Sequence, residues 1–330
     1  MVRPLLRGKH SLVPPGNRSL HSIRTRTRLP EHCSLLESKL PGAKVPFRKS
    51  KKKPEPEASP EAKAEATQLK LDRPTADEIY EQVSRNARYE LVRPAIALAI
   101  SGIAGGLTMG LTALAPAIVT GVLGLSAITK LIASVVYPVG FIAVILGRAQ
   151  LFTENTLYPV ALMLAERRHV VSTIRLWAIV LPSNLVGAFL FALLAIRTGG
   201  LRPEYVTALV NAGVEFARVP WGHVYWSAVI AGWIIALVAW LVSGSHSITG
   251  SVMLIWFLAF IVGLGGLAHC VATSADVFAA VLGHRVTAVQ YLAWLLPTFL
   301  GNVTGGVVMV TLLEYGQVKG GEPEGRGFPR

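Results

Sequence analysis

Six long apolar segments limit the folds that are open to this chain. Each stays apolar for about 20 residues, the length needed to cross a hydrocarbon core of about 30 Å. Of all residues, 52% are hydrophobic and only 15% are charged, which is far from the composition of a soluble domain. We therefore predict an all-α polytopic membrane protein with six transmembrane helices, at roughly residues 91–117, 130–164, 175–196, 224–243, 250–283 and 287–314.

The segments that flank this six-span domain, residues 91–316, are polar. Residues 1–73 are rich in Arg, Lys, Pro and Ser and are expected to form a disordered basic tail. A capping box that begins at Thr75 predicts a short amphipathic helix over residues 74–90. Its apolar face would suit the membrane interface or a neighbouring subunit, and a solvated helix is an equal alternative. Residues 317–330 are expected to form a C-terminal tail.

The net charge of +13 lies mostly in the tails and short connections. We interpret it as a topology signal and not as a nucleic-acid-binding surface. Because basic residues favour the cytoplasmic side, we predict that both termini are cytoplasmic and that the protein lies in a bacterial inner membrane. Three arginines in the loop expected outside, between the third and fourth spans, fit this rule poorly: Arg197, Arg202 and Arg218.

The first 30 residues contain basic side chains but no Asp or Glu. This composition resembles that of an organellar transit peptide. An organellar membrane is therefore the alternative location, although a bacterial cytoplasmic tail is the favoured interpretation.

The second and fifth segments are too long for one straight helix, and both are polar at their middle. Unwound backbone at membrane depth is tolerated only where it lines a cavity or is covered by protein. We therefore predict two broken helices beside a permeation path. The polar residues are Gln150, Thr153, Glu154 and Asn155 in the second segment, and His269, Thr273, Ser274 and Asp276 in the fifth.

Two landmarks recur at the same offset and indicate an internal duplication. Leu146-Gly147 and Leu264-Gly265 are 118 residues apart, as are the motifs that begin at Asn184 and Asn302. With three spans in each unit, the second unit must enter the membrane from the opposite face. Such an inverted repeat places a site near the midplane, where the two broken helices meet.

His269 is the main candidate for function, because an ionisable side chain inside a membrane span is rare without a role. An imidazole changes charge near neutral pH and suits proton transfer to a weak-acid anion, or stabilisation of the anion. Thr153 offers a hydroxyl that would bind an anion, orient the imidazole or bond its own backbone. Leu151 and Phe152 would form apolar walls, or serve packing alone.

Three further polar residues of the second segment are candidates for tuning the site: Arg148, Gln150 and Glu154. Arg148 and Glu154 are expected to form an ion pair, or separate contacts at the pore mouth or a subunit interface. For Asn184 and Asn302 we favour a structural role, because asparagine side chains hydrogen-bond between membrane helices.

The sequence shows no enzyme signature. It has no paired metal-ligand spacing, no nucleophile with a neighbouring base and no Walker-type nucleotide motif. We therefore expect no enzymatic activity, no cofactor and no metal.

Four stretches together resemble the formate/nitrite transporter family across about residues 74–318. They are GFIAVILGRAQLFTENTLYPV (residues 140–160), NLVGAFLFALL, GLAHCVATS and GNVTGGVVMVTLLEY, and they occur in the order expected for that family. The resemblance implies a homopentamer of six-span, aquaporin-like protomers, each with its own pore for small monovalent anions. It also implies that anion passage is coupled to protonation around a central histidine between two hydrophobic constrictions.

The family's Leu-Phe-Thr motif is matched by residues 151–153, and its central histidine by His269. Val262 falls at a constriction position that is often aromatic. The family's vestibule lysine falls at Phe216, which makes Arg218 the nearest basic residue. Glu154 stands where a small residue is common and places a negative charge on an anion path. These departures indicate a divergent branch that is similar to a bacterial inner-membrane subgroup.

The sequence thus favours a channel or transporter for formate-like or nitrite-like anions, with the proton and the lipid bilayer as its other partners. One alternative keeps the fold but passes a neutral solute, or a cation admitted by Glu154. The other is a non-transporting membrane protein that binds a partner through its basic tail.

Overall fold

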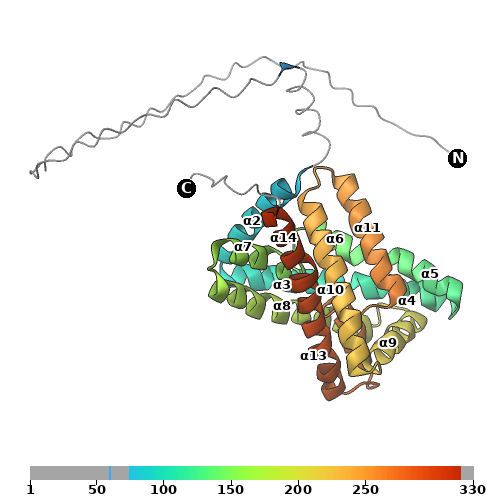
Figure 1. Ribbon diagram of the computed structural model, residues 1–330. Helices are drawn as coiled ribbons and strands as arrows, with labels where there is room; N and C mark the ends of the chain where they lie inside the picture. Colours follow the sequence, from blue (N-terminus) through green and yellow to red (C-terminus); the bar gives the residue numbers. More distant parts are fainter. Residues whose placement is uncertain (1–58, 61–73, 321–330) are drawn as a thin grey trace, which may run out of the picture. The chain divides into compact units, whose positions relative to one another are not determined.

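The computed structural model describes residues 59–60 and 74–320, apart from the side chain of Lys319. Nearly all of the expected basic tail and most of the expected C-terminal tail lie outside these residues. Within the described part, six apolar helical segments are long enough to cross a membrane, which confirms the predicted number. They are Ala95–Leu123, Ala127–Leu146, Val170–Arg197, Trp221–Ser243, Ile248–Gly265 and Ala288–Val318 (Figure 1).

Three of these segments are built from two or three consecutive helical elements. In chain order the elements are α2 (Ala76–Val92), α3 (Ala95–Met109), α4 (Leu111–Leu123), α5 (Ala127–Val136), α6 (Val139–Leu146), η1 (Glu154–Thr156), α7 (Tyr158–Glu166), α8 (Val170–Arg197), α9 (Pro203–Ala217), α10 (Trp221–Ser243), α11 (Ile248–Gly265), α12 (Ala272–Leu282), α13 (Ala288–Thr304), the π-helix η2 (Gly305–Leu312) and α14 (Leu313–Gly320).

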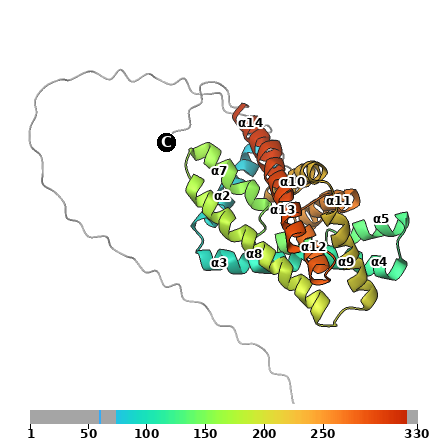
Figure 2. The same ribbon diagram turned by 90° about the horizontal axis from the view of Figure 1, so that it is seen from below.

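The second and fifth predicted segments are both interrupted, as expected from their length and polarity. The second divides between α6 and η1, and the fifth divides between α11 and α12. Gly266 ends α11 with φ of 57°, a left-handed conformation that glycine adopts without steric cost. The short helices α7 and α12 are therefore the second halves of two broken spans (Figure 2).

Two helix pairs make equivalent close contacts. Helix α3 packs along α8 at Gly106, where a Cβ atom would collide with the carbonyl oxygen of Asn184. Helix α10 packs along α13 at Gly232, where a Cβ atom would collide with the carbonyl oxygen of Asn302. Small residues allow membrane helices to approach this closely. The two halves of the chain thus repeat one packing arrangement.

The segment between the third and fourth spans differs from the loop expected there. It forms the helix α9, which begins with a proline at its first turn and packs against α4 and α12. Proline suits that position because it has no backbone N–H to leave unpaired. With 15 residues, α9 is too short to cross the membrane, and it covers one end of the bundle.

The N-terminal helix α2 packs inside the bundle. The predicted capping box is present, since Thr75 Oγ1 accepts from the Glu78 N–H at 3.2 Å and Glu78 accepts from the Thr75 N–H at 2.9 Å. Val83 is fully buried in a cluster with residues of α7 and α10, and the hydroxyl of Tyr80 donates to the Ala161 carbonyl at 3.0 Å. The buried apolar side chains of α2 therefore contact neighbouring helices of the same chain.

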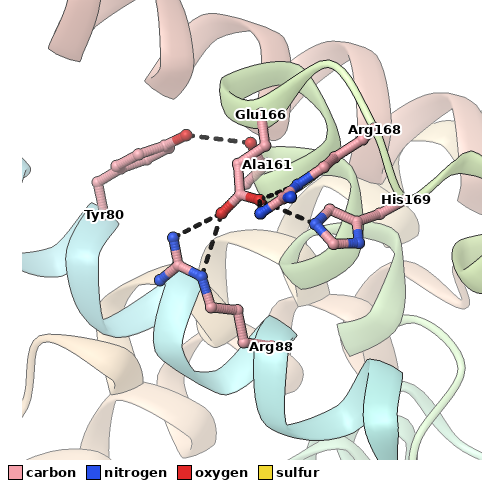
Figure 3. Close-up of polar contacts among 6 residues, drawn as sticks. All are labelled: Tyr80, Arg88, Ala161, Glu166, Arg168 and His169. Atoms are coloured by element: carbon pink, nitrogen blue, oxygen red, sulfur yellow. Dashed lines mark hydrogen bonds and ion pairs between the residues drawn. The ribbon is translucent and has the colours of Figure 1, made fainter. Parts of the chain in front are cut away.

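Glu166 joins α2 to the end of α7 (Figure 3). Its carboxylate accepts hydrogen bonds from Arg88 at 2.7 and 3.1 Å, from Arg168 Nε at 2.6 Å and from His169 Nε2 at 2.9 Å. The hydrogen bonds from His169 and Arg88 are the main reasons that the pKa of Glu166 falls from 4.5 to about 2. The carboxylate thus stays charged in the folded protein at any physiological pH.

Glu166→Gln is expected to destabilise the protein modestly, because ion pairs at an exposed site contribute about 0.2–1 kcal/mol. Since the folded pKa of about 2 lies below the usual 4.5, this contribution is complete above pH 4.5 and is lost as the pH falls toward 2. Thermal unfolding in detergent should show a lower Tm for the variant at neutral pH and a shrinking difference in acid. Glu81→Gln removes a single, more exposed pair of 3.4 Å within α2 and should lower the Tm less. An equal loss of Tm in both variants would show that the effect comes from the change in net charge.

Candidate functional site

The two helix breaks meet at one contact between side chains. Thr153 Oγ1 lies 2.9 Å from His269 Nε2, and both residues are fully buried. Thr153 ends the first break and His269 lies within the second, so the contact joins positions 116 residues apart in the chain. The structure thus brings together the two side chains that sequence reasoning placed in separate breaks.

The backbone of α12 fixes the imidazole of His269. Its Nδ1 faces the backbone N–H groups of Val271 at 3.3 Å and Ala272 at 3.1 Å, so Nδ1 is the acceptor. From this hydrogen-bond pattern we assign the proton of the neutral ring to Nε2, which then donates to the Thr153 hydroxyl. Phe141 packs edge-on to the ring, with the centroids 5.3 Å apart. The imidazole is thereby held with its N–H toward the other break.

Asn184 holds the backbone of the first break. Its Oδ1 accepts from the Phe152 N–H at 2.8 Å, and its Nδ2 donates to the carbonyls of Gly102 and Gln150, both at 2.8 Å. These bonds join α8 to α3 and satisfy peptide groups that the broken helix leaves unpaired.

Asn302 repeats this arrangement in the second break. Its Oδ1 accepts from the Cys270 N–H at 2.8 Å, and its Nδ2 donates to the carbonyls of Ala228 at 2.8 Å and Ala268 at 3.1 Å. Phe152 and Cys270 are 118 residues apart, which is also the spacing of the two asparagines. The asparagines therefore bridge neighbouring helices and also hold the backbone of the two breaks. The spacing of 118 residues was the feature of the sequence that indicated their role in the breaks.

Two cavities approach this contact from different ends of the bundle. Cavity 1, of about 1150 Å³, is lined by α4, α5, α9 and α12 and by the C-terminal end of α11. Cavity 2, of about 730 Å³, is lined by α2, the first break, the C-terminal end of α10 and the start of α11. Helix α10 runs from the α9 end of the bundle toward cavity 2, so the two cavities lie toward opposite ends of the bundle.

One of the two predicted apolar constriction residues lines each cavity. Leu151 lines cavity 2 with 1% of its surface exposed, and Val262 lines cavity 1 with none exposed. Phe152 lines neither cavity, because its ring packs between Trp177 and Phe299, with centroid distances of 5.7 and 5.5 Å. An effect of Phe152 on permeation therefore stays a prediction.

The charged candidates lie in the cavities. Arg148, Gln150 and Glu154 line cavity 2, and no N···O distance of 4.0 Å or less joins the described side chains of Arg148 and Glu154. The expected ion pair is thus not formed, and both side chains contact the cavity separately. Gln150 also accepts from Asn155 Nδ2 at 2.9 Å. Arg218 is exposed and lines cavity 1, and its role as a vestibule residue stays a prediction.

Sequence reasoning missed part of the wall of each cavity. Glu90 of α2 and Arg93, which directly follows this helix, line cavity 2 and form an ion pair of 2.9 Å. Lys130 and Arg285 line cavity 1 together with Arg218. No local pattern marks these residues, because their place depends on how distant helices pack.

Comparisons with known proteins agree with this architecture. A family model described as formate/nitrite transporter matches residues 77–316. The inner membrane protein YfdC of Escherichia coli (strain K12) is 31% identical over 250 residues, which cover 73% of this chain and 78% of that protein. A probable formate transporter of Methanothermobacter thermautotrophicus is 31% identical over 205 residues, or 57% of this chain and 75% of that protein.

Two solved structures share the fold. A structure described as an FNT family ion channel aligns with a TM-score of 0.66 at 20% identity, covering 76% of this chain and all of that one. A pentameric formate channel with formate bound aligns with a TM-score of 0.59 at 19% identity, covering 68% of this chain and 97% of that one.

Proposed function

This chain belongs to the formate/nitrite transporter family, and we propose that it passes formate, nitrite or a similar small monovalent anion across a membrane. One observation carries the proposal: the Thr153–His269 contact, with 2.9 Å between Oγ1 and Nε2, lies between two cavities that face opposite ends of the bundle. An enzymatic activity is not part of this proposal.

The geometry favours stabilisation of a partly dehydrated anion. Leu151 and Val262 offer no hydrogen bonds to replace a hydration shell, so a hydrated ion is held back at either side of the contact. The Nε2–H of His269 and the hydroxyl of Thr153 are donors that an anion can use in place of water. A proton that travels with the anion makes a neutral acid, which crosses the apolar walls at a lower electrostatic cost.

The oligomeric state and the membrane location are proposed from similar proteins. We propose a homopentamer, since an aligned structure is a pentameric formate channel, and a bacterial inner membrane, since the Escherichia coli relative is an inner membrane protein. Both termini are proposed to be cytoplasmic. An organellar membrane remains the alternative if the N-terminal segment is a transit peptide.

Glu154 supports a second candidate cargo, because its carboxylate lines cavity 2 without an ion pair to Arg148. A negative charge at a pore mouth repels anions and concentrates cations. The same path would then carry a cation such as ammonium.

A substrate panel in proteoliposomes distinguishes these cargoes. We expect formate and nitrite fluxes above those of protein-free vesicles, read out as internal pH change, and little ammonium flux. Removal of the charge in Glu154→Ser should raise anion flux by about fivefold, as expected for a like charge near the path. Glu81→Ser, on an exposed face of α2 outside the lining of cavity 2, is the control. Ammonium flux that exceeds formate flux and falls in Glu154→Ser would establish the cation alternative instead.

A further inference from the structure

A second acidic side chain lies on the proposed path, on the opposite side of His269 from Glu154. Asp276 is on α12, the second half of the fifth span, and lines cavity 1. It is 8% exposed, so its carboxyl group is largely shielded from bulk water. One turn earlier on the same helix, Thr273 Oγ1 accepts from the backbone N–H of His269 at 3.1 Å. Asp276 is therefore connected to the central contact through a short, rigid helix.

The carboxyl group of Asp276 has no cationic partner in the described part of the chain. No Lys, Arg or His nitrogen lies within 4.0 Å of it, and no other described residue donates a hydrogen bond to its oxygens. Membrane-embedded carboxylates usually pair with a cation or with backbone donors. Asp276 has its own backbone N–H as a donor but no cationic partner among the described residues, so its carboxyl group can still interact with what passes through the cavity.

The surroundings of Asp276 contain other titratable groups, and most of them lie toward solvent. Glu204 and Glu215 of α9 are exposed, and the nearest ion pair of Glu204 is a loose contact of 3.9 Å to Arg202. Tyr137, which directly follows α5, lines the same cavity as Asp276. The charged and titratable groups that line cavity 1 are Lys130, Tyr137, Glu204, Glu215, Arg218 and Arg285.

The remaining helices packed on α12 contribute no further charge to this cavity. Tyr291 of α13 lies 3.1 Å from the Ser274 hydroxyl on the other side of α12, and Arg197 of α8 donates to the Leu282 carbonyl at the far end of α12. The described residues of α4 that line the cavity are not titratable. Among the charged side chains that line cavity 1, Asp276 is thus buried and the others are exposed.

We propose that Asp276 is the proton-dependent selectivity residue of cavity 1, an inference that rests on the proposed anion transport. When protonated, its O–H donates a hydrogen bond to the arriving anion. When ionised, its charge repels the anion, and burial leaves this repulsion poorly screened. Asp276 keeps its proton while the anion passes toward His269, so its protonation state sets the rate of passage and no proton is transferred at this residue.

Equilibrium exchange of isotope-labelled formate tests this role, with the same pH on both sides of the vesicle membrane so that protein orientation does not matter. Wild-type exchange, after subtraction of protein-free vesicles, should fall between about pH 5 and about pH 8. Asp276→Asn keeps the shape and a hydrogen-bond donor but never ionises. Its exchange should equal that of wild type at the lower pH and exceed it by about tenfold at the higher pH, because the repulsive charge is absent.

Two variants complete the experiment. Asp276→Glu retains an ionisable group and should retain the fall with pH, whereas Glu204→Gln removes an exposed acid from the same cavity and should behave as wild type. If size-exclusion chromatography shows that Asp276→Asn does not assemble, Asp276→Ser is judged by the same criterion. The role of Asp276 is overturned if wild-type formate exchange does not depend on pH. It is also overturned if Asp276→Asn shows the same fall in exchange with pH as wild type. In both cases the proposed anion transport itself still stands. A wild type that exchanges no formate overturns the proposed function and this inference with it.

Discussion

Replacement of His269 with alanine is expected to slow strongly the internal pH change that formate drives in proteoliposomes. The substitution removes the Nε2–H that faces Thr153, the imidazole donor at the meeting of the two breaks. A hydrogen bond to a charged partner contributes about 1.5–3 kcal/mol, so we expect formate flux to fall by about 10- to 100-fold. The measurement is the initial rate of internal acidification after formate is added.

His246→Ala is the matched control for this experiment. His246 also lines a cavity, but it is exposed and lies at the mouth of cavity 2, so its loss should not change the rate. The assembly of each variant in detergent is checked by size-exclusion chromatography before reconstitution. Formate flux through His269→Ala with the rate and pH dependence of wild type would remove His269 from the mechanism.

Asn302→Ala is expected to destabilise the protein strongly. It removes three hydrogen bonds and leaves the N–H of Cys270 and the carbonyl of Ala268 without a partner in a buried helix break. Each unsatisfied buried group costs about 1–3 kcal/mol, so the total approaches about 2–6 kcal/mol. The upper end of this range is comparable with the entire free energy of unfolding of a typical domain, about 5–15 kcal/mol. Thermal unfolding in detergent should show a large fall in Tm or a failure to assemble.

Asn184→Ala should have an effect of the same size, because Asn184 makes the equivalent three bonds in the first break. Asn211→Ala provides the control, since Asn211 is an exposed asparagine on α9 that lines cavity 1. If the Tm of Asn302→Ala equalled that of wild type, the hydrogen bonds of the Asn302 amide would not be what stabilises the backbone of the second break.

The internal repeat shows which contacts could be predicted from the sequence and which could not. The offset of 118 residues correctly relates Asn184 to Asn302 and Phe152 to Cys270, whose N–H groups donate to those asparagines. It does not hold in the first span of each half, where the equivalent glycines Gly106 and Gly232 are 126 residues apart. The second half is shorter between its first span and its break, which a single offset does not reveal.

The same offset did not identify the central contact. It aligns Leu151 with His269, whereas the structure places Thr153 against His269. Residues that are equivalent in a repeat make the same contacts within their own halves and do not have to touch each other. The meeting of Thr153 with His269 depends on how the two halves are packed together.

The sequence by itself determined the six spans, the two breaks and the pairing of the asparagines. These follow from local composition and spacing, because each span must be apolar over its own length and each break needs polar partners nearby. Only the tertiary structure decided that α9 is a helix, that α2 lines cavity 2, that Phe152 faces the core and that Asp276 faces cavity 1. The physical reason is that the surroundings of a side chain are set by helices distant in sequence, and no local pattern encodes their packing.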